Sequence, residues 1–218
     1  MKKFAVPALA AALTIGAAAA VPALAEKAAG DLLVRGRIIH VKPDESSDLK
    51  LGTTGIAGHA AVSNSTVPEL DFSYFFTDNI AAELILGTTH HDVAAKGSPL
   101  GASVDLGDVW LLPPTVTVQY HFNPKGKVSP YIGAGVNYTI FYGDDPGAAL
   151  GIDYDNSFGL AAQAGVDFAL TDKWSLNLDV KKLWLNTDVK VNAGLVSPVN
   201  AKVDLDPWIF GVGVGYRF

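Results

Sequence analysis

The chain of 218 residues contains no cysteine, which excludes both a disulfide framework and a thiolate metal site. Basic residues are also few: 16 Lys and Arg stand against 22 Asp and Glu, for a formal net charge of −6. Such a chain lacks the positive patch expected of a nucleic-acid-binding protein. After residue 25, no apolar run approaches the roughly 18 residues that a membrane-spanning helix needs. The composition therefore excludes thiol chemistry, nucleic-acid partners and helical membrane spans in residues 26–218.

Residues 1–25 have the three parts of a secretory signal peptide. The chain begins with a basic tripeptide, continues through apolar and small residues, and reaches Ala-Leu-Ala immediately before Glu26. An N-terminal membrane helix is the alternative, but two prolines interrupt the apolar stretch. We expect residues 1–25 to be cleaved and residues 26–218 to form one domain. An apolar, exported chain without spanning helices can satisfy its backbone in lipid only as a closed barrel.

Apolar residues recur at every second position, which is the pattern of β-strands. In residues 69–76, for example, Leu70, Phe72 and Tyr74 share one face, and Glu69 and Asp71 share the other. The same alternation predicts strands at residues 32–41, 69–76, 81–86, 115–122, 130–140, 158–168, 174–180 and 208–218. These eight strands give the even number that single-chain bacterial outer-membrane barrels require.

The connections alternate strictly between short and long. The short ones are residues 77–79, 123–127 and 171–173, and the long ones are residues 42–65, 88–108, 142–156 and 187–206. This alternation is expected when turns on one side are periplasmic and loops on the other are extracellular. We therefore predict an all-β fold, an eight-stranded antiparallel transmembrane β-barrel of the cell outer membrane.

The two faces of the predicted strands differ in charge. The apolar face carries no charged residue in its central stretch, as a lipid-facing surface requires. The opposite face carries Arg35, Arg37, Asp71, Glu83, Asp167, Asp179, Lys181 and Arg217. Ionised groups in so narrow a lumen must be paired, because an isolated buried charge is very unfavourable. The pattern predicts an ion-pair network closing the lower lumen, as structural filling or, alternatively, as a proton or ion pathway.

The second long connection leads into an apolar segment, Trp110, Leu111 and Leu112, followed by two prolines. We expect Asp108 to cap a short helical turn before the prolines end it. Exposed apolar side chains are unfavourable, so these three should cover the barrel mouth or line its entry. Apolar loops over a barrel favour apolar ligands rather than ions.

No catalytic arrangement has supporting context. His90 and His91 precede Asp92, but adjacent strand residues point to opposite faces, which favours a surface pair over a metal site. His121 lies on the inward face without a Ser and acid partner at any motif spacing. Nucleophile elbows, phosphate loops and His-Glu-x-x-His are absent from the sequence. We expect no enzyme activity, no metal and no cofactor.

The chain resembles the OmpW family of small outer-membrane proteins in four stretches that follow the family order. They are PELDFSYFFTDNIAAEL at residues 68–84, LPPT at 112–115, PYIGAGVNYT at 130–139, and DPW at 206–208 with GYRF at 215–218. The resemblance implies an eight-stranded barrel whose narrow, partly hydrophobic channel admits small apolar molecules. It also implies a lumen blocked towards the periplasm, with ligands leaving sideways through the wall into the bilayer.

The resemblance further implies a hydrophobic constriction, where the inward residues of this chain are Ile85 and, across from it, Lys181. A lysine there departs from an all-apolar gate. The predicted function is passive uptake of small hydrophobic molecules, and the alternative is a structural or adhesive receptor barrel acting through its extracellular loops. Expected partners are outer-membrane lipid, a small hydrophobic ligand, and the barrel assembly machinery, which would recognise the C-terminal strand ending at Phe218.

Overall fold

The computed structural model describes residues 26–52, 54–98, 101–195 and 199–218. The expected signal peptide, residues 1–25, lies outside the described residues. Within the described residues, every regular element is a β-strand. No helix long and apolar enough to cross a membrane occurs in that part of the chain.

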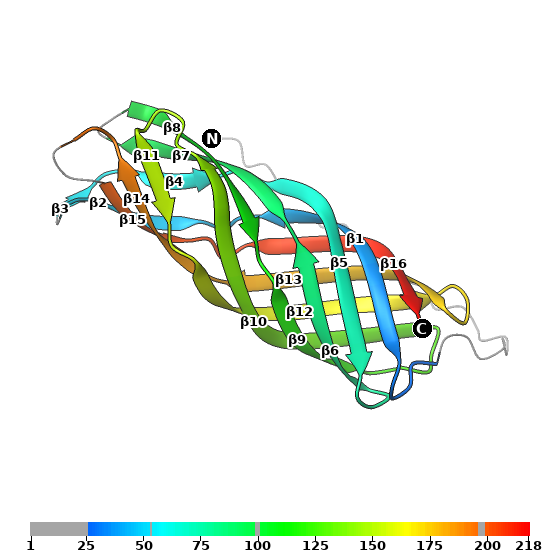
Figure 1. Ribbon diagram of the computed structural model, residues 1–218. Coiled ribbons are helices and arrows are strands. Elements are labelled where there is room, and N and C mark those ends of the chain that lie inside the picture. The colour runs from blue at the N-terminus through cyan, green and yellow to red at the C-terminus, as the bar shows by residue number, and fades with distance from the viewer. Residues whose placement is uncertain (1–25, 53, 99–100, 196–198) are drawn as a thin grey trace, which may run out of the picture.

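Eight strands form the wall of a closed barrel (Figure 1). They are β1 (Leu32–Lys42), β5 (Ser65–Phe75), β6 (Ile80–Gly87), β9 (Thr115–His121), β10 (Val128–Asp145), β12 (Ser157–Ala169), β13 (Trp174–Trp184) and β16 (Trp208–Arg217). Each strand pairs antiparallel with its neighbours in chain order, and β16 pairs with β1 to complete the ring. The predicted eight-stranded antiparallel barrel is confirmed.

The closing seam is continuous. β1 pairs with β16 from Leu33↔Arg217 to Lys42↔Trp208, and with β5 from Leu32↔Tyr74 to Val41↔Ser65. Strand β1 is thus paired along both sides. A closed ring leaves no sheet edge, and lipid cannot satisfy the backbone groups of an open edge.

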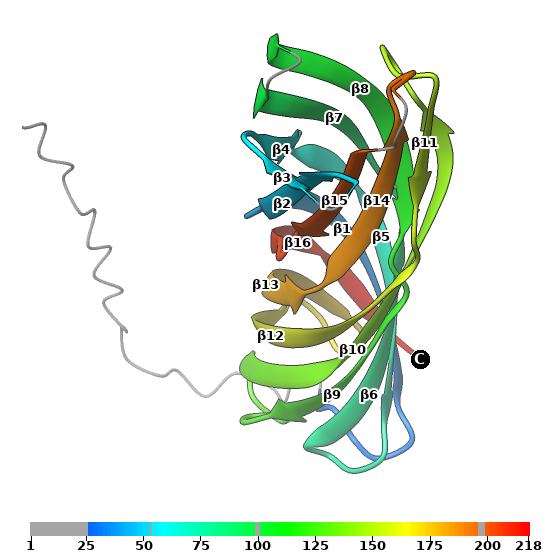
Figure 2. The same cartoon turned by 90° about the vertical axis from the view of Figure 1, so that its left-hand side faces the viewer.

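The long connections are largely β-structure rather than loops. They contain β2 (Ser46–Leu51), β3 (Thr54–Ile56), β4 (His59–Val62), β7 (Thr89–Ser98), β8 (Gly101–Leu112), β11 (Gly151–Tyr154), β14 (Asn186–Asn192) and β15 (Val199–Asp204). Strands β4, β7 and β8 continue the wall from β10, and β11, β14, β15, β2 and β3 form a second sheet. Both extensions lie at the same end of the barrel (Figure 2), which we call the sheet end; the end with the three short turns is the turn end.

The prediction of a helical turn capped by Asp108 is wrong. Asp108 lies within β8 and pairs with Asp92 in β7 and with Asp145 in β10. The prolines that follow end the strand rather than a helix. The alternation of side chains across β8 outweighs the local capping signal, because the neighbouring strands supply a complete ladder.

The side-chain pattern inverts along the strands. In the barrel wall, outward side chains such as Leu176 and Leu178 are exposed apolar groups, while inward ones such as Asn177 are buried and polar. At the sheet end the apolar side chains point inward, and Val189 and Val191 join a buried apolar cluster. The lower lumen is therefore polar and the upper lumen apolar.

Inward glycines make room for large side chains of the lumen. A Cβ placed on Gly165 would lie 2.4 Å from the hydroxyl of Tyr131 and 2.7 Å from the backbone oxygen of Leu178. Tyr131 is almost fully buried. The glycine therefore allows the tyrosine ring to occupy the centre of the barrel.

We predict that Gly165→Ala lowers the free energy of unfolding by about 1–3 kcal/mol, because the added methyl group overpacks the lumen. Urea unfolding of the protein refolded in lipid vesicles measures the change. Gly36→Ala is the matched control, since a Cβ there meets no atom of the described residues within 4 Å. Equal stability of the two variants would contradict the prediction.

Candidate functional site

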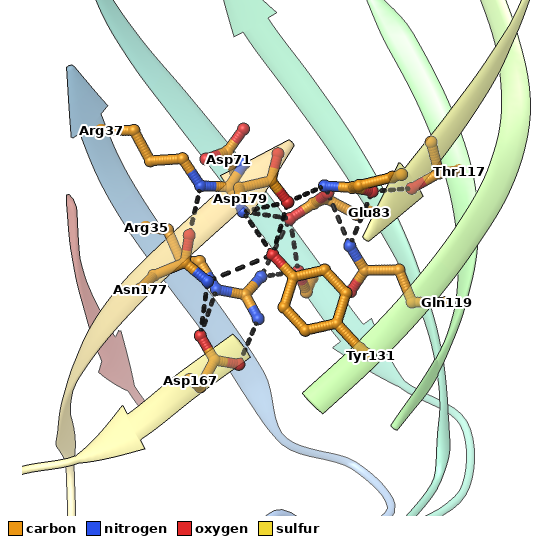
Figure 3. A network of polar contacts seen from close by, with 12 residues as sticks. Arg35, Arg37, Asp71, Glu83, Thr117, Gln119, Tyr131, Asp167, Asn177 and Asp179 are labelled. Carbon is orange, nitrogen blue, oxygen red and sulfur yellow. Dashed lines mark hydrogen bonds and ion pairs between the residues drawn. The ribbon is translucent and has the colours of Figure 1, made fainter. Parts of the chain in front are cut away.

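The lower lumen is filled by a cluster of charged side chains, which we call the plug (Figure 3). Its members are all less than 7% exposed, and they are Lys27, Arg35, Arg37, Glu69, Asp71, Glu83, Asp167, Asp179 and Lys181. They come from β1, β5, β6, β12, β13 and the segment before β1. All inward charged residues predicted for the network belong to it except Arg217.

Arg35 joins opposite walls of the barrel. Its Nη2 atom lies 2.8 Å from Asp167 Oδ2, and its Nε atom donates to Oδ1 of the same carboxylate at 3.2 Å. Its Nη1 atom lies 2.9 Å from Glu83 Oε1. The two-point contact with Asp167 matches the planar guanidinium to the planar carboxylate, which fixes the orientation of both groups.

Arg37 contacts several carboxylates at once. Its Nη1 atom lies 2.9 Å from Asp71 and 3.2 Å from Glu69, and its Nη2 atom lies 3.3 Å from Glu83. Its Nε atom donates to Asn177 at 2.8 Å. A guanidinium has five N–H donors, so one side chain can serve acceptors from several strands.

Neutral side chains complete the plug. Tyr131 donates from its hydroxyl to Asp179 at 2.7 Å, and Gln119 donates to Glu83 at 2.7 Å. Gln163 donates to both of these carboxylates at 2.9 Å. Each of these residues occupies an inward position of its strand, but alternation alone does not mark an inward residue as a partner of the charges. A buried ion-pair network is more stable when its remaining lone pairs are satisfied, and these groups satisfy several of them. Both Asp71 oxygens and Asp179 Oδ1 accept no hydrogen bond within the described residues.

Two basic residues near the turn end differ from the sequence prediction: Arg217, predicted for the network, lies outside the plug, and Lys27, for which no role was predicted, lies in it. Arg217 lies at the rim, where its Nη1 atom is 2.9 Å from Asp31 and its Nη2 atom donates to the backbone oxygen of Asp172. Lys27 instead enters the plug, with its Nζ atom 2.7 Å from Asp167 and 3.0 Å from His121 Nδ1. Lys27 precedes the first strand, so no alternation pattern could assign it to the lumen.

His121 is part of this packing. Besides Lys27, its ring contacts Gln119 Oε1 through Nε2 at 3.1 Å, and the side chain is fully buried. No group of three or more His, Cys, Asp or Glu side chains able to hold a metal ion occurs in the described part of the chain.

Above the plug, towards the sheet end, lies an apolar cavity of about 280 Å³. Its lining includes the inward side chains Leu111, Phe141, Leu183, Val189 and Val203, and towards the plug Glu69, Ile85 and Lys181. The expected gate residues Ile85 and Lys181 therefore both line the floor of the cavity. The Nζ atom of Lys181 lies 2.6 Å from Glu69 and 3.2 Å from Asp179. The lysine charge is thus balanced within the floor.

The three residues expected at the loop entry divide between two faces of β8. Leu111 lines the cavity. Trp110 and Leu112 point outward, and the Trp110 ring packs on His90 with 4.7 Å between ring centroids. One of the three therefore contributes to the lumen.

The adjacent histidines also point to opposite faces, as expected. His90 faces outward, with Nε2 2.8 Å from Asp108 Oδ1. His91 lines the cavity and is only 3% exposed, so the interpretation of both as surface residues is wrong for His91. Its Nδ1 atom donates to the backbone oxygen of Ser63 at 2.6 Å. Burial lowers the pKa of His91, since desolvation disfavours the imidazolium form.

The wall is interrupted beside the cavity. The β5–β6 ladder ends at Glu69↔Gly87, and in the described structure residues 65–68 of β5 have no ladder partner in residues 88–91. Pro68 has no backbone N–H to donate. Pairing resumes where the Ser63 amide donates to the Asp92 oxygen at 2.9 Å. We call the interruption between residues 65–68 and 88–91 the wall gap.

Comparisons with known proteins agree on the type of barrel. The OmpW family model matches residues 28–218. The chain is 44% identical to an uncharacterized outer-membrane protein y4mB of Sinorhizobium fredii, covering 85% of this chain and 79% of that protein. It is 38% identical to outer membrane protein W of Vibrio cholerae, covering 87% and 89%. The crystal structure of OprG from Pseudomonas aeruginosa superimposes with a TM-score of 0.84 at 32% identity, covering 89% of this chain and 99% of OprG.

We predict that Arg37→Met lowers the free energy of unfolding by roughly 3–5 kcal/mol, because it leaves buried carboxylates without their counter-charge. Urea unfolding in lipid vesicles measures the loss. Lys42→Met is the matched control, since Lys42 lies on the same strand but faces outward. Comparable unfolding of both variants would show that the plug contributes no stability.

Proposed function

The chain belongs to the OmpW family and is a β-barrel of the outer membrane, and from this premise we propose that it is a passive uptake channel for small hydrophobic molecules. In this proposal the sheet end is extracellular, as expected for the end with the long connections. Ligands enter the cavity from that end and leave sideways through the wall gap into the bilayer.

The apolar cavity directly above the charged plug is the observation that carries the proposal. A small apolar molecule gains about 25 cal/mol for each Å² of surface removed from water, so the cavity favours its entry. The floor is different, because passage through it would separate pairs such as Arg37 with Asp71, 2.9 Å apart. Breaking one buried pair is unfavourable by about 3–5 kcal/mol. The axial route is therefore closed to an apolar molecule that has no charge to offer in exchange.

The wall gap supplies the lateral route. Gly87 and His91 border the gap and also line the cavity, so the gap and the cavity adjoin. In this proposal the gap opens towards the bilayer, and the outward side chains beside it, such as Thr66 and Thr88, are polar and exposed. A hydrophobic molecule leaving there passes from one apolar environment to another without crossing the plug. Lipid and the hydrophobic ligand are the partners in this proposal.

The closing strand supports a separate proposal about assembly. β16 presents Phe210, Val212 and Val214 outward and is followed by the exposed Phe218, whose ring packs edge-on against Tyr216. We propose that the barrel assembly machinery recognises this apolar C-terminal strand.

Blocking the cavity floor tests the lumen route. We predict that Ile85→Trp reduces uptake of an apolar fluorescent tracer into proteoliposomes at least severalfold, because the indole would fill the space above the Lys181–Glu69 pair. Leu84→Trp is the matched control, since the neighbouring side chain points outward and is 39% exposed. Uptake that is unchanged in Ile85→Trp would favour the alternative, a structural or receptor barrel acting through the sheet end.

Closing the wall gap tests the lateral exit. Continued past its last pair, Glu69↔Gly87, the register of β5 with β6 would bring Thr66 opposite His90 across the gap. The wild-type chain has no cysteine. We predict that Thr66→Cys with His90→Cys, joined by a reducible thiol cross-linker, retains tracer binding but loses transfer to the bilayer until reduced. The control joins Leu70→Cys to Leu86→Cys, an outward pair within the intact ladder. Full transfer through the cross-linked gap would exclude this exit.

A further inference from the structure

His91 is a polar residue in the lining of the apolar cavity. The side chain is 3% exposed to solvent and lines the cavity wall in β7, beside the wall gap. Its Nδ1 atom is engaged by the backbone oxygen of Ser63 at 2.6 Å. The described residues provide no hydrogen-bond partner for its Nε2 atom.

The bond to Ser63 determines the tautomer of His91. A carbonyl oxygen can only accept, so the Nδ1 atom carries the hydrogen. The ring is neutral at physiological pH because burial lowers its pKa. Nε2 is then a lone-pair acceptor, and it lies farther from the backbone than Nδ1. The ring thus offers one acceptor towards the lumen.

Several other polar groups of the cavity lining already have partners, whereas the buried Tyr154 hydroxyl has none among the described residues. Thr115 donates to the Pro113 oxygen at 3.0 Å, and Thr139 donates to Asn137 at 2.7 Å. Lys181 and Glu69 are paired with each other. An acceptor that stays unpaired in an apolar space is unfavourable, and a ligand that carries a donor would relieve this.

We propose that His91 is a binding residue that selects hydrophobic molecules bearing a hydroxyl group, such as medium-chain alcohols and phenols. The hydroxyl donates to Nε2 while the apolar part of the ligand occupies the cavity. This inference rests on the proposed function and names a substrate class for it. The low polarity of the site strengthens the bond, and the position of His91 beside the wall gap holds the ligand next to its exit.

A matched pair of ligands tests the proposal. 1-Heptanol and hexyl methyl ether have the same number of heavy atoms, but only the alcohol can donate a hydrogen bond. Each ligand competes with a bound apolar fluorophore in the full mature protein in nanodiscs. We expect the wild type to bind the alcohol about three- to tenfold more tightly than the ether, as one net hydrogen bond predicts. The alcohol, and not the ether, should also shift the nitrogen-15 resonance of His91 Nε2.

Variants separate binding from structure. His91→Asn keeps a donor for Ser63 but lacks an atom at the Nε2 position, so the preference for the alcohol should fall to about onefold while ether binding is retained. His90→Asn, which changes the outward neighbour, should keep the preference.

Three results would overturn the inference. Equal binding of alcohol and ether by the wild type does so and leaves the uptake proposal intact, because an apolar ligand still binds. A preference for the alcohol that persists in His91→Asn assigns the selection to another group, as does the absence of a nitrogen-15 shift at His91 in the wild type. Failure of both ligands to bind contradicts the inference and the proposed function together.

Discussion

The pairing of β1 with β16 is the contact on which the other features of this protein depend. It closes the ring, and closure fixes eight strands as the circumference of the lumen. A lumen of that width is filled by side chains rather than by water. Inward charges such as Arg35 and Glu83 must therefore form ion pairs, so the plug is a consequence of the closure.

The inversion of side-chain polarity along the strands gives the molecule two functional levels. Where the outside faces lipid, the chain places apolar residues outward and its ionised residues inward. Where the strands continue beyond the lipid, the apolar residues turn inward and line the cavity. On β13 and β14 the change takes place within ten residues, from Asp179 inside to Val189 inside. The cavity and the plug are thus two results of one alternating pattern.

Much of the fold was predictable because period-two alternation depends on local sequence. It located all eight wall strands and the inward faces of Arg37 and Asp167. The same pattern continued through the long connections, but glycines and polar residues there were interpreted as loops, and β7, β8 and β14 were missed. Lys27 was not predictable, since no periodicity precedes the first strand. The wall gap depends on which strands do not pair, and the presence of Pro68 alone does not predict this. The burial of His91 was not predictable, because it depends on the distant Ser63 oxygen and on Val109 of β8, opposite which it lies.

The ion pairs of the plug can form only late in folding, because they join residues that are far apart in the chain. Arg35 and Asp167 are 132 positions apart in the chain, and Lys27 and Asp167 are 140 apart. Contacts of such large sequence separation form late, because the intervening chain must first be ordered. Most of the wall must therefore be in place before these charges can neutralise one another. Until then the charged side chains remain hydrated. Insertion of an incomplete ring into the bilayer is therefore unfavourable, because it would remove unpaired charges from water. The ion pairs of the lumen thereby act as a thermodynamic check that favours insertion of complete barrels over partial ones.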